Sequence, residues 1–330
     1  MWKYFSALFK KDCRLLASGK FFLLTAGFLA LYTAYINFGY IRFLKMPIYN
    51  VYLYDPTGTQ TETSSQIKTV TSRKALDAAL KTDDNGVGLD ASSGEIKVLL
   101  YRGAPPVDRH RADYALSLLQ PAAFVSPEKI GAFAPEEKAR REITCELLFF
   151  ELSAVGFLGI AAVLFKEKGM GVIRVHAVLP FSKNLFLASK LAVFLLCDLC
   201  FAALLTLFNV GAGGIAILPA VLLQTAILSL VMALAGLGFS LLLKDFRTFT
   251  LVYLLLAVFA ATPVFLSANT SVKFGWIDFH PFYHFFMGLK NAYFQTPAAR
   301  PLYYICSVGA IGLLFLGVQF AFHREMGKEA

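Results

Sequence analysis

Long apolar runs separated by short polar segments make up most of the chain. Six of these runs reach or approach the roughly 20 apolar residues that a helix needs to cross a bilayer. They are Phe21 to Ile41, Leu147 to Phe165, Leu191 to Val210, Ile215 to Leu243, Phe249 to Ala268 and Leu302 to Phe322. The fourth run is too long for one perpendicular helix, so we expect it to tilt or to begin as a re-entrant segment near Pro219.

The composition agrees with a membrane protein. Of the 330 residues, 57% are hydrophobic and only 16% are charged, which is not the balance of a water-soluble protein. The five cysteines are an odd number and lie mostly in apolar runs, so a disulfide framework is not expected. The formal net charge of +9 admits two explanations, a nucleic-acid partner or a membrane orientation.

The positions of the basic residues decide between these explanations. With six spans both termini lie on one side, and the short segments on that side carry fourteen Lys and Arg residues. The short connections on the opposite side carry three, namely Lys273, Lys290 and Arg300. Because Lys and Arg accumulate in cytoplasmic loops, we expect both termini in the cytoplasm, with a multi-pass chain in the cell membrane. The excess charge then reports topology, and no nucleic-acid partner is expected.

Residues 42–145 differ in composition from the rest. About half of the charged residues of the chain lie between Arg42 and Glu142. Period-two alternation and turn residues predict strands, and amphipathic spacing predicts helices. The expected strands are Asn50 to Tyr54, Gly86 to Asp90 and Glu95 to Tyr101, and the expected helices are Ser65 to Lys81 and Asp108 to Leu119. We therefore expect an α-helical polytopic membrane protein whose six transmembrane helices carry a small α/β extracytoplasmic domain after the first.

The loop between the second and third spans, residues 166–190, has a distinctive order of residues. It begins with Lys166-Glu167-Lys168 and continues through Gly169 and Gly171 into a short amphipathic stretch that ends at Pro180. Ser182 is placed to cap the next helix. A short helix held between two spans can transmit force from a cytoplasmic partner, or it can simply lie on the lipid headgroups.

This loop resembles the coupling-helix region of type-two ATP-binding-cassette (ABC) exporter permeases. The residues that match the pattern are Glu167, Gly169, Gly171, Pro180, Ser182 and Lys190. The sequence departs from the pattern at Met170 to Val172, where Gly-Thr-Leu is usual, and at Arg174, where an acid is common. The turn at Tyr54-Asp55-Pro56 and the run from Gly156 to Lys168 are most similar to the fluoroquinolone-export-type branch of that family.

The resemblance implies a permease, expected in a bacterial cell membrane, that pairs with itself or a sister permease and is driven by separate ATPase subunits. The contact with the ATPase would involve Glu167, Gly169, Gly171, Arg174, Pro180 and Ser182. The chain has no Gly-x-x-x-x-Gly-Lys-Ser/Thr loop, because Gly19-Lys20 and Gly327-Lys328 lack the required surroundings. We therefore expect no enzymatic activity and no cofactor in this chain, with ATP and Mg²⁺ bound by the partner.

Two acids fall at membrane depth, Glu151 in the second span and Asp198 in the third. Ionisable groups in hydrocarbon are costly, and they usually face a cavity, a bundle interior or a partner charge. Both are candidates for a substrate pathway, with protonated or paired structural groups as the alternative. The substrate itself remains open among drug-like amphipathic cations, lipids and peptides.

Other motifs have simpler explanations. His280 and His284 have metal-ligand spacing, but they supply only two imidazoles within an aromatic stretch. Cys197 and Cys200 lie in an apolar span, where buried structural cysteines are expected. No metal site is predicted. The main alternative function is a membrane-anchored sensor or assembly protein that acts through residues 42–145, and membrane lipid is a partner in either case.

Overall fold

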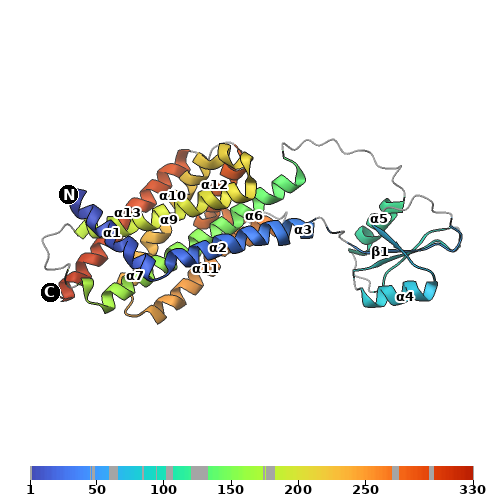
Figure 1. Ribbon diagram of the computed structural model, residues 1–330, viewed down its shortest axis with the longest axis horizontal. Coiled ribbons are helices and arrows are strands. Elements are labelled where there is room, and N and C mark those ends of the chain that lie inside the picture. Colours follow the sequence, from blue (N-terminus) through green and yellow to red (C-terminus); the bar gives the residue numbers. More distant parts are fainter. Residues whose placement is uncertain are drawn as a thin grey trace. The chain divides into compact units, whose positions relative to one another are not determined.

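The chain divides into two compact units in a computed structural model. The structure describes residues 2–44, 46, 49–58, 66–83, 85–93, 95–101, 107–119, 133–173, 175, 183–269, 275–296 and 301–329. One unit consists of residues 1–41 and 133–330, and the other of residues 42–132 (Figure 1). The first is a helical bundle and the second contains the β-sheet.

The bundle is built from helices of different lengths. Its elements are α1 (Trp2–Ser18), α2 (Phe21–Ala34), η1 (Tyr35–Tyr40), α6 (Pro135–Glu151), η3 (Leu152–Gly156), α7 (Phe157–Gly169), α9 (Lys183–Val210), α10 (Ala212–Leu242), α11 (Phe246–Asn269), η4 (Gly275–Phe279), α12 (Pro281–Phe294) and α13 (Pro301–Glu329). Segments η1 and η3 are π-helical, and α3 (Ile41–Leu44) extends the first span. Helix α1 and the end of α13 lie at one end of the bundle, which we call the terminal end (Figure 1).

Within the described part of the chain, six helices are long and apolar enough to cross a membrane, as expected, which is consistent with a multi-pass membrane protein. Their ranges are Phe21–Leu44, Pro135–Gly169, Asn184–Val210, Ala212–Leu242, Phe246–Leu266 and Pro301–Met326. Large apolar side chains are exposed on the outer faces of α2, α11 and α13, for example Leu23, Leu255 and Leu313. Such faces suit hydrocarbon as their surroundings and would be unfavourable in water.

Helix α10 forms the centre of the bundle and packs against α7, α9, α12 and α13. It is one continuous helix of 31 residues with Pro219 inside it, so the re-entrant start that we considered is not present. Gly236 explains its close approach to α7, because a Cβ atom there would lie 2.7 Å from the carbonyl oxygen of Phe157. The small residues of α10 near this point therefore serve packing within the subunit.

Residues 42–132 form a unit around a four-stranded sheet of order β2-β1-β3-β4. The strands are β1 (Val51–Tyr54), β2 (Ile67–Thr69), β3 (Val87–Asp90) and β4 (Lys97–Leu99). Strand β1 pairs in parallel with β2 and β3, and β3 pairs antiparallel with β4. Because side chains alternate along a strand, Val87 and Leu89 face α5 (Val107–Leu119), whereas Gly88 faces α4 (Arg73–Thr82).

Two expectations for this region need correction. The helix expected from Ser65 to Lys81 is wrong in its first part, where strand β2 stands and α4 begins only after its cap Ser72. The domain boundary expected at residue 145 falls inside α6, which starts at Pro135 and belongs to the bundle. The second span is thus longer than the apolar run, because its first turns are charged but still helical.

Candidate functional site

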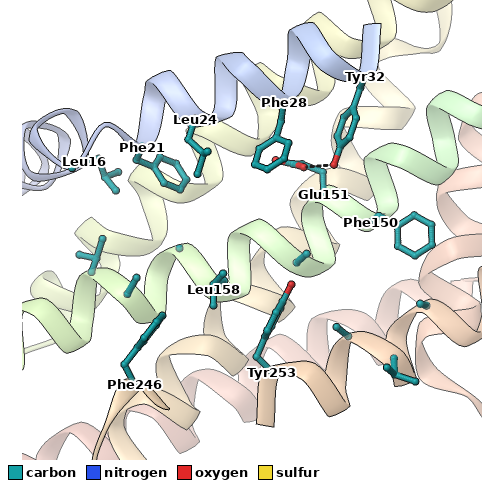
Figure 2. A pocket seen from close by; sticks show the side chains of 18 of the residues that line it. Leu16, Phe21, Leu24, Phe28, Tyr32, Phe150, Glu151, Leu158, Phe246 and Tyr253 are labelled. Carbon is teal, nitrogen blue, oxygen red and sulfur yellow. Dashed lines mark hydrogen bonds between the residues drawn. The ribbon is translucent and has the colours of Figure 1, made fainter. Parts of the chain in front are cut away.

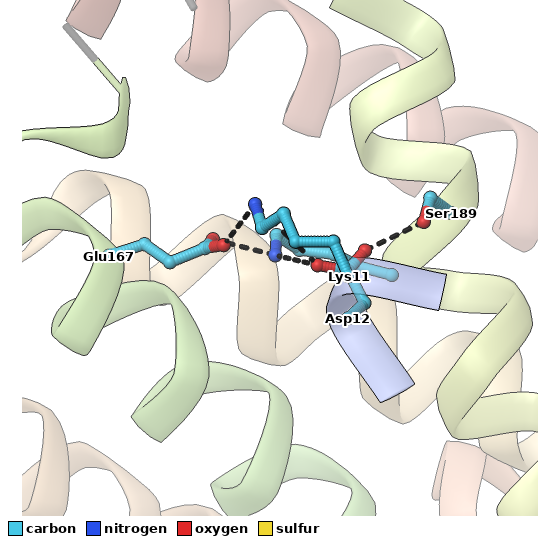
Figure 3. Close-up of polar contacts among 5 residues, drawn as sticks. Lys11, Asp12, Glu167 and Ser189 are labelled. Carbon is cyan, nitrogen blue, oxygen red and sulfur yellow. Dashed lines mark hydrogen bonds and ion pairs between the residues drawn. The ribbon is translucent and has the colours of Figure 1, made fainter. Parts of the chain in front are cut away.

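Four charged side chains form a closed ring at the terminal end of the bundle (Figure 3). Lys190 Nζ lies 2.6 Å from Glu167 Oε2 and 3.2 Å from Asp12 Oδ1. Lys11 Nζ lies 2.8 Å from Glu167 Oε1 and 3.8 Å from Asp12 Oδ1. Each ammonium group therefore touches both carboxylates, and the ring carries two positive and two negative charges.

The ring is largely closed to solvent. Glu167, Lys190 and Asp12 are 0%, 1% and 3% exposed, and only Lys11 reaches the surface. The second oxygen of Asp12 accepts a hydrogen bond from Ser189 Oγ at 2.6 Å. Buried charges are tolerated when they are paired and hydrogen-bonded, because unpaired ones lose their hydration without compensation.

The ring connects both ends of the loop that resembles a coupling helix. Glu167 lies two residues before the end of α7, and Ser189 and Lys190 lie in the second and third turns of α9. Helix α1 supplies Lys11 and Asp12 from the opposite side of the ring. The loop between α7 and α9 is therefore anchored on both flanks, and to a third helix as well.

The sequence of α1 explains how its acid reaches this position. Asp12 and Leu16, one helical turn apart, are the two buried residues of α1, whereas the neighbouring basic residues remain at least partly accessible. Leu16 packs in the same apolar cluster as Phe186 and Leu187 of α9. Burial of this apolar stripe brings Asp12 against the start of the third span.

A second polar contact fixes α7 next to the ring. Lys168 Nζ lies 3.1 Å from Glu325 Oε1 of α13 and 3.0 Å from the carbonyl oxygen of Ser240, near the end of α10. A cation suits the carboxyl end of a helix, where carbonyl groups lack partners. The successive residues Glu167 and Lys168 thus tie the end of the second span to four other helices.

The predicted coupling residues are only partly described by the structure. Gly169 is the last residue of α7, and Gly171 follows it with a φ of 68°, a conformation that favours glycine. Ile173 is buried in the same apolar cluster as Leu16 and Phe186, whereas Val175 is exposed. The other three predicted residues, Arg174, Pro180 and Ser182, lie outside the described residues.

The two predicted membrane-depth acids lie on either side of the π-helical segment η3. Glu151 immediately precedes it, is 4% exposed, and accepts a hydrogen bond from Tyr32 Oη of α2 at 2.9 Å (Figure 2). Asp198 accepts one from Ser229 Oγ of α10 at 2.5 Å and lies against Gly156, the last residue of η3. π-Helical turns inside α-helices often mark functional sites.

The two acids nevertheless face different surroundings. Glu151 lines a cavity between α2, the second span and α11, whereas Asp198 does not line it. Asp198 is instead enclosed between α9 and α10 with its serine partner. We therefore retain Glu151 as the stronger candidate for a substrate contact and regard Asp198 as a hydrogen-bonded structural group.

The remaining candidate motifs give no site. His284 contacts the carbonyl oxygen of Asp278 at 2.8 Å, and the His280 ring packs at a tilt against Phe259 with ring centres 4.1 Å apart. Across the described part of the chain, no group of three or more His, Cys, Asp or Glu residues is placed to hold a metal ion. Cys197 and Cys200 are free cysteines within α9, but Cys197 is only partly buried and Cys200 is exposed, so the expectation that both are buried is wrong.

Arginines at the opposite end of the bundle are a feature that the pattern of charges did not reveal. Arg140 donates a hydrogen bond to Asn37 of η1 at 2.7 Å, and Arg141 donates one to the carbonyl oxygen of Tyr293 at 2.5 Å. Arg141 is buried beside Glu137. These two residues fasten the first turns of α6 to neighbouring helices, so they are structural groups at the start of a span.

No protein-family model, curated protein or solved structure matches this chain. Membership of the ABC permease family therefore stays a prediction from the residues of the loop.

Proposed function

We propose that the protein is the permease subunit of an ABC transporter, an exporter driven by ATPase subunits in trans. The observation that carries the proposal is the buried ring of Lys11, Asp12, Glu167 and Lys190 at the base of the loop between the second and third spans. A loop that merely rests on lipid headgroups does not require both of its flanks to be fixed by buried ion pairs.

The ring gives the loop a mechanical connection to the bundle. A partner that pushes on residues 170–182 moves the end of α7 and the start of α9 together, because Glu167 and Lys190 are joined at 2.6 Å. Helix α1 moves with them through Asp12. Rigid elements with few internal joints transmit such displacements, and the spans would then switch access between the two sides of the membrane.

The distribution of charge supports a cytoplasmic position for this loop. The segments on the side of the loop and of both termini carry fourteen Lys and Arg residues, against three in the short connections on the other side. The unit of residues 42–132 would then be extracytoplasmic, where it would gate the exit or contact a molecule outside. The lack of a phosphate-binding loop makes a separate ATPase necessary.

The proposal is tested by purifying the full chain with an affinity tag from its native membranes in mild detergent. We expect an ATPase subunit to co-purify, with vanadate-sensitive ATP hydrolysis. Glu167→Gln should lower the hydrolysis rate per complex at least fivefold while the ATPase stays bound, because it breaks the ring without changing side-chain size.

The matched control is Glu136→Gln, which removes a partly exposed ion pair with Arg140 at the other end of the bundle. Its hydrolysis rate should stay within twofold of the unmodified complex. A chain that purifies without any ATPase would overturn the proposal in favour of an anchored protein acting through residues 42–132. An unchanged rate in Glu167→Gln would overturn the role of the ring.

A further inference from the structure

A cavity of about 1020 Å³ lies between α2, the second span and α11 (Figure 2). Its volume is at the upper end of the range of about 300–1,000 Å³ that is usual for small-molecule pockets. Apolar side chains form most of its wall, among them Leu24, Leu158 and Leu266. A space of this size and character suits a drug-sized amphipathic molecule.

One carboxyl group breaks the apolar wall. Glu151 Oε2 is held by the Tyr32 hydroxyl, whereas Oε1 has no hydrogen-bond partner among the described residues. The side chain is 4% exposed, so bulk water does not replace that partner. A buried carboxyl group of this kind must either stay protonated or have a cation beside it, because an uncompensated carboxylate is costly there.

No basic side chain among the described residues that line the cavity is close enough to Glu151 to neutralise its charge. Lys166 is the one basic residue among the described residues that line the cavity, and it lies fifteen positions further along the same span. At 1.5 Å per residue this separation is about 22 Å along the helix axis. Glu151 therefore lacks a counter-charge in the cavity, and a bound molecule is the available source of one.

Aromatic side chains line the same cavity as the carboxyl group. Phe28 and Tyr32 of α2 lie with ring centres 5.9 Å apart, and Phe150 and Phe265 are in contact with ring centres 6.1 Å apart. Tyr253 of α11 points toward the second span from the other side (Figure 2). Ring faces attract cations electrostatically, and desolvated sites strengthen this attraction.

We propose that this cavity binds an amphipathic monocation, whose single positive centre lies beside Glu151 and whose apolar groups fill the space toward Leu158. One carboxylate can neutralise one positive charge. The aromatic side chains of the wall can contact a bulky cation that has no hydrogen-bond donors. The inference rests on the proposed function, because it names the class of substrate that the permease would carry.

The test uses tetraphenylphosphonium and tetraphenylborate, which have nearly the same shape and opposite charge. Displaceable binding of each radiolabelled ion is measured on the full chain in lipid nanodiscs, with empty nanodiscs subtracted. We expect saturable binding of tetraphenylphosphonium and at least tenfold weaker binding of tetraphenylborate. Equal binding of both ions, or no displaceable binding of the cation, would overturn the proposal.

Two isosteric variants locate the site. Glu151→Gln should weaken binding of tetraphenylphosphonium at least tenfold, whereas Asp198→Asn, which also removes a buried acid at membrane depth, should change it less than threefold. An unchanged affinity in Glu151→Gln would refute the assignment. Since the unmodified chain alone discriminates between the two ions, the test does not depend on the folding of a variant.

The binding assay needs no ATPase, so it separates this inference from the proposed function. Binding of the cation by a chain that purifies without an ATPase would refute the proposed transporter function and support the proposed cation site. A chain that associates with an ATPase but binds neither ion would support the proposed transporter function and refute the proposed cation site.

Discussion

Removal of Lys190 from the buried ring should destabilise the bundle strongly. Lys190→Met keeps an unbranched side chain of similar length and takes away one positive charge. Two carboxylates, Asp12 and Glu167, then remain in a site that is almost closed to water, with Lys11 as their one cation. The variant therefore leaves one negative charge without compensation.

The size of the effect follows from the burial of the partners. Loss of one member of a buried ion pair costs about 3–5 kcal/mol, whereas exposed pairs contribute at most about 1 kcal/mol. The Lys11 side chain is 38% exposed and still lies near both carboxylates, so the lower end, about 3 kcal/mol, is expected. Lys10→Met on the accessible side of α1 should cost less than about 0.5 kcal/mol.

The assay is reversible unfolding in mixed micelles, followed by circular dichroism as the fraction of SDS is raised. Adding Glu167→Gln to Lys190→Met restores the balance of charge, with Lys11 opposite Asp12. The double variant should therefore be no less stable than Lys190→Met alone. A cost below about 1 kcal/mol for Lys190→Met would show that the four charges do not act as one unit. The same would follow if the cost of the double variant equalled the sum of the costs of Lys190→Met and Glu167→Gln measured singly.

Three further predictions concern other parts of the chain. Gly236→Ala should lower the unfolding free energy in the same assay by about 1–3 kcal/mol, because the new methyl group meets the backbone of α7, whereas Gly238→Ala, which has ordinary contacts, should cost little. Ser72→Ala removes the cap of α4 and should cost about 1 kcal/mol, seen as about fivefold faster hydrogen exchange of its first-turn amides. Asp245 accepts a hydrogen bond from the Thr248 amide, which holds the pKa of the carboxyl below its ordinary value; this cap should persist at pH 4 and be lost only at lower pH, as the amide shift of Thr248 would report.

The membrane spans could be predicted from the sequence because the bilayer itself fixes the length of an apolar run. The residues at which each span begins and ends could not be predicted in this way. The second span begins at Pro135, twelve residues before its apolar run, since charged residues such as Arg140 and Arg141 find partners on other helices. Those partners are set by packing, which no local pattern records.

Strand β2 shows the same limit on a smaller scale. Residues 67–69 are helical by periodicity, yet they pair in parallel with β1, and three residues of pairing are enough to fix a strand. The correct part of the prediction, α4, has its own local signal in the cap Ser72 and in the buried Leu76 and Leu80. Short strands depend on a neighbour that is distant in sequence.

The candidate site was predictable in part. Glu167 and Lys190 were found through the resemblance of the loop, and Glu151 through its depth in a span. Asp12 was missed, although it is the one acid among the first 54 residues and lies in a basic amphipathic helix. An isolated acid in a basic amphipathic helix is a residue to examine, but only the packing of α1 against α9 identifies Lys190 as its partner.

We propose that the loop between the second and third spans receives the movement of an ATPase. A photo-crosslinking residue in place of Met170, which is exposed at the end of α7, tests it most directly, with the same residue in place of the exposed Leu313 of α13 as control. In a complex that hydrolyses ATP, we expect a crosslink from position 170 to the ATPase subunit and none from position 313. An active complex without a crosslink from position 170, or with equal crosslinks from both positions, would show that this loop does not receive the movement of the ATPase.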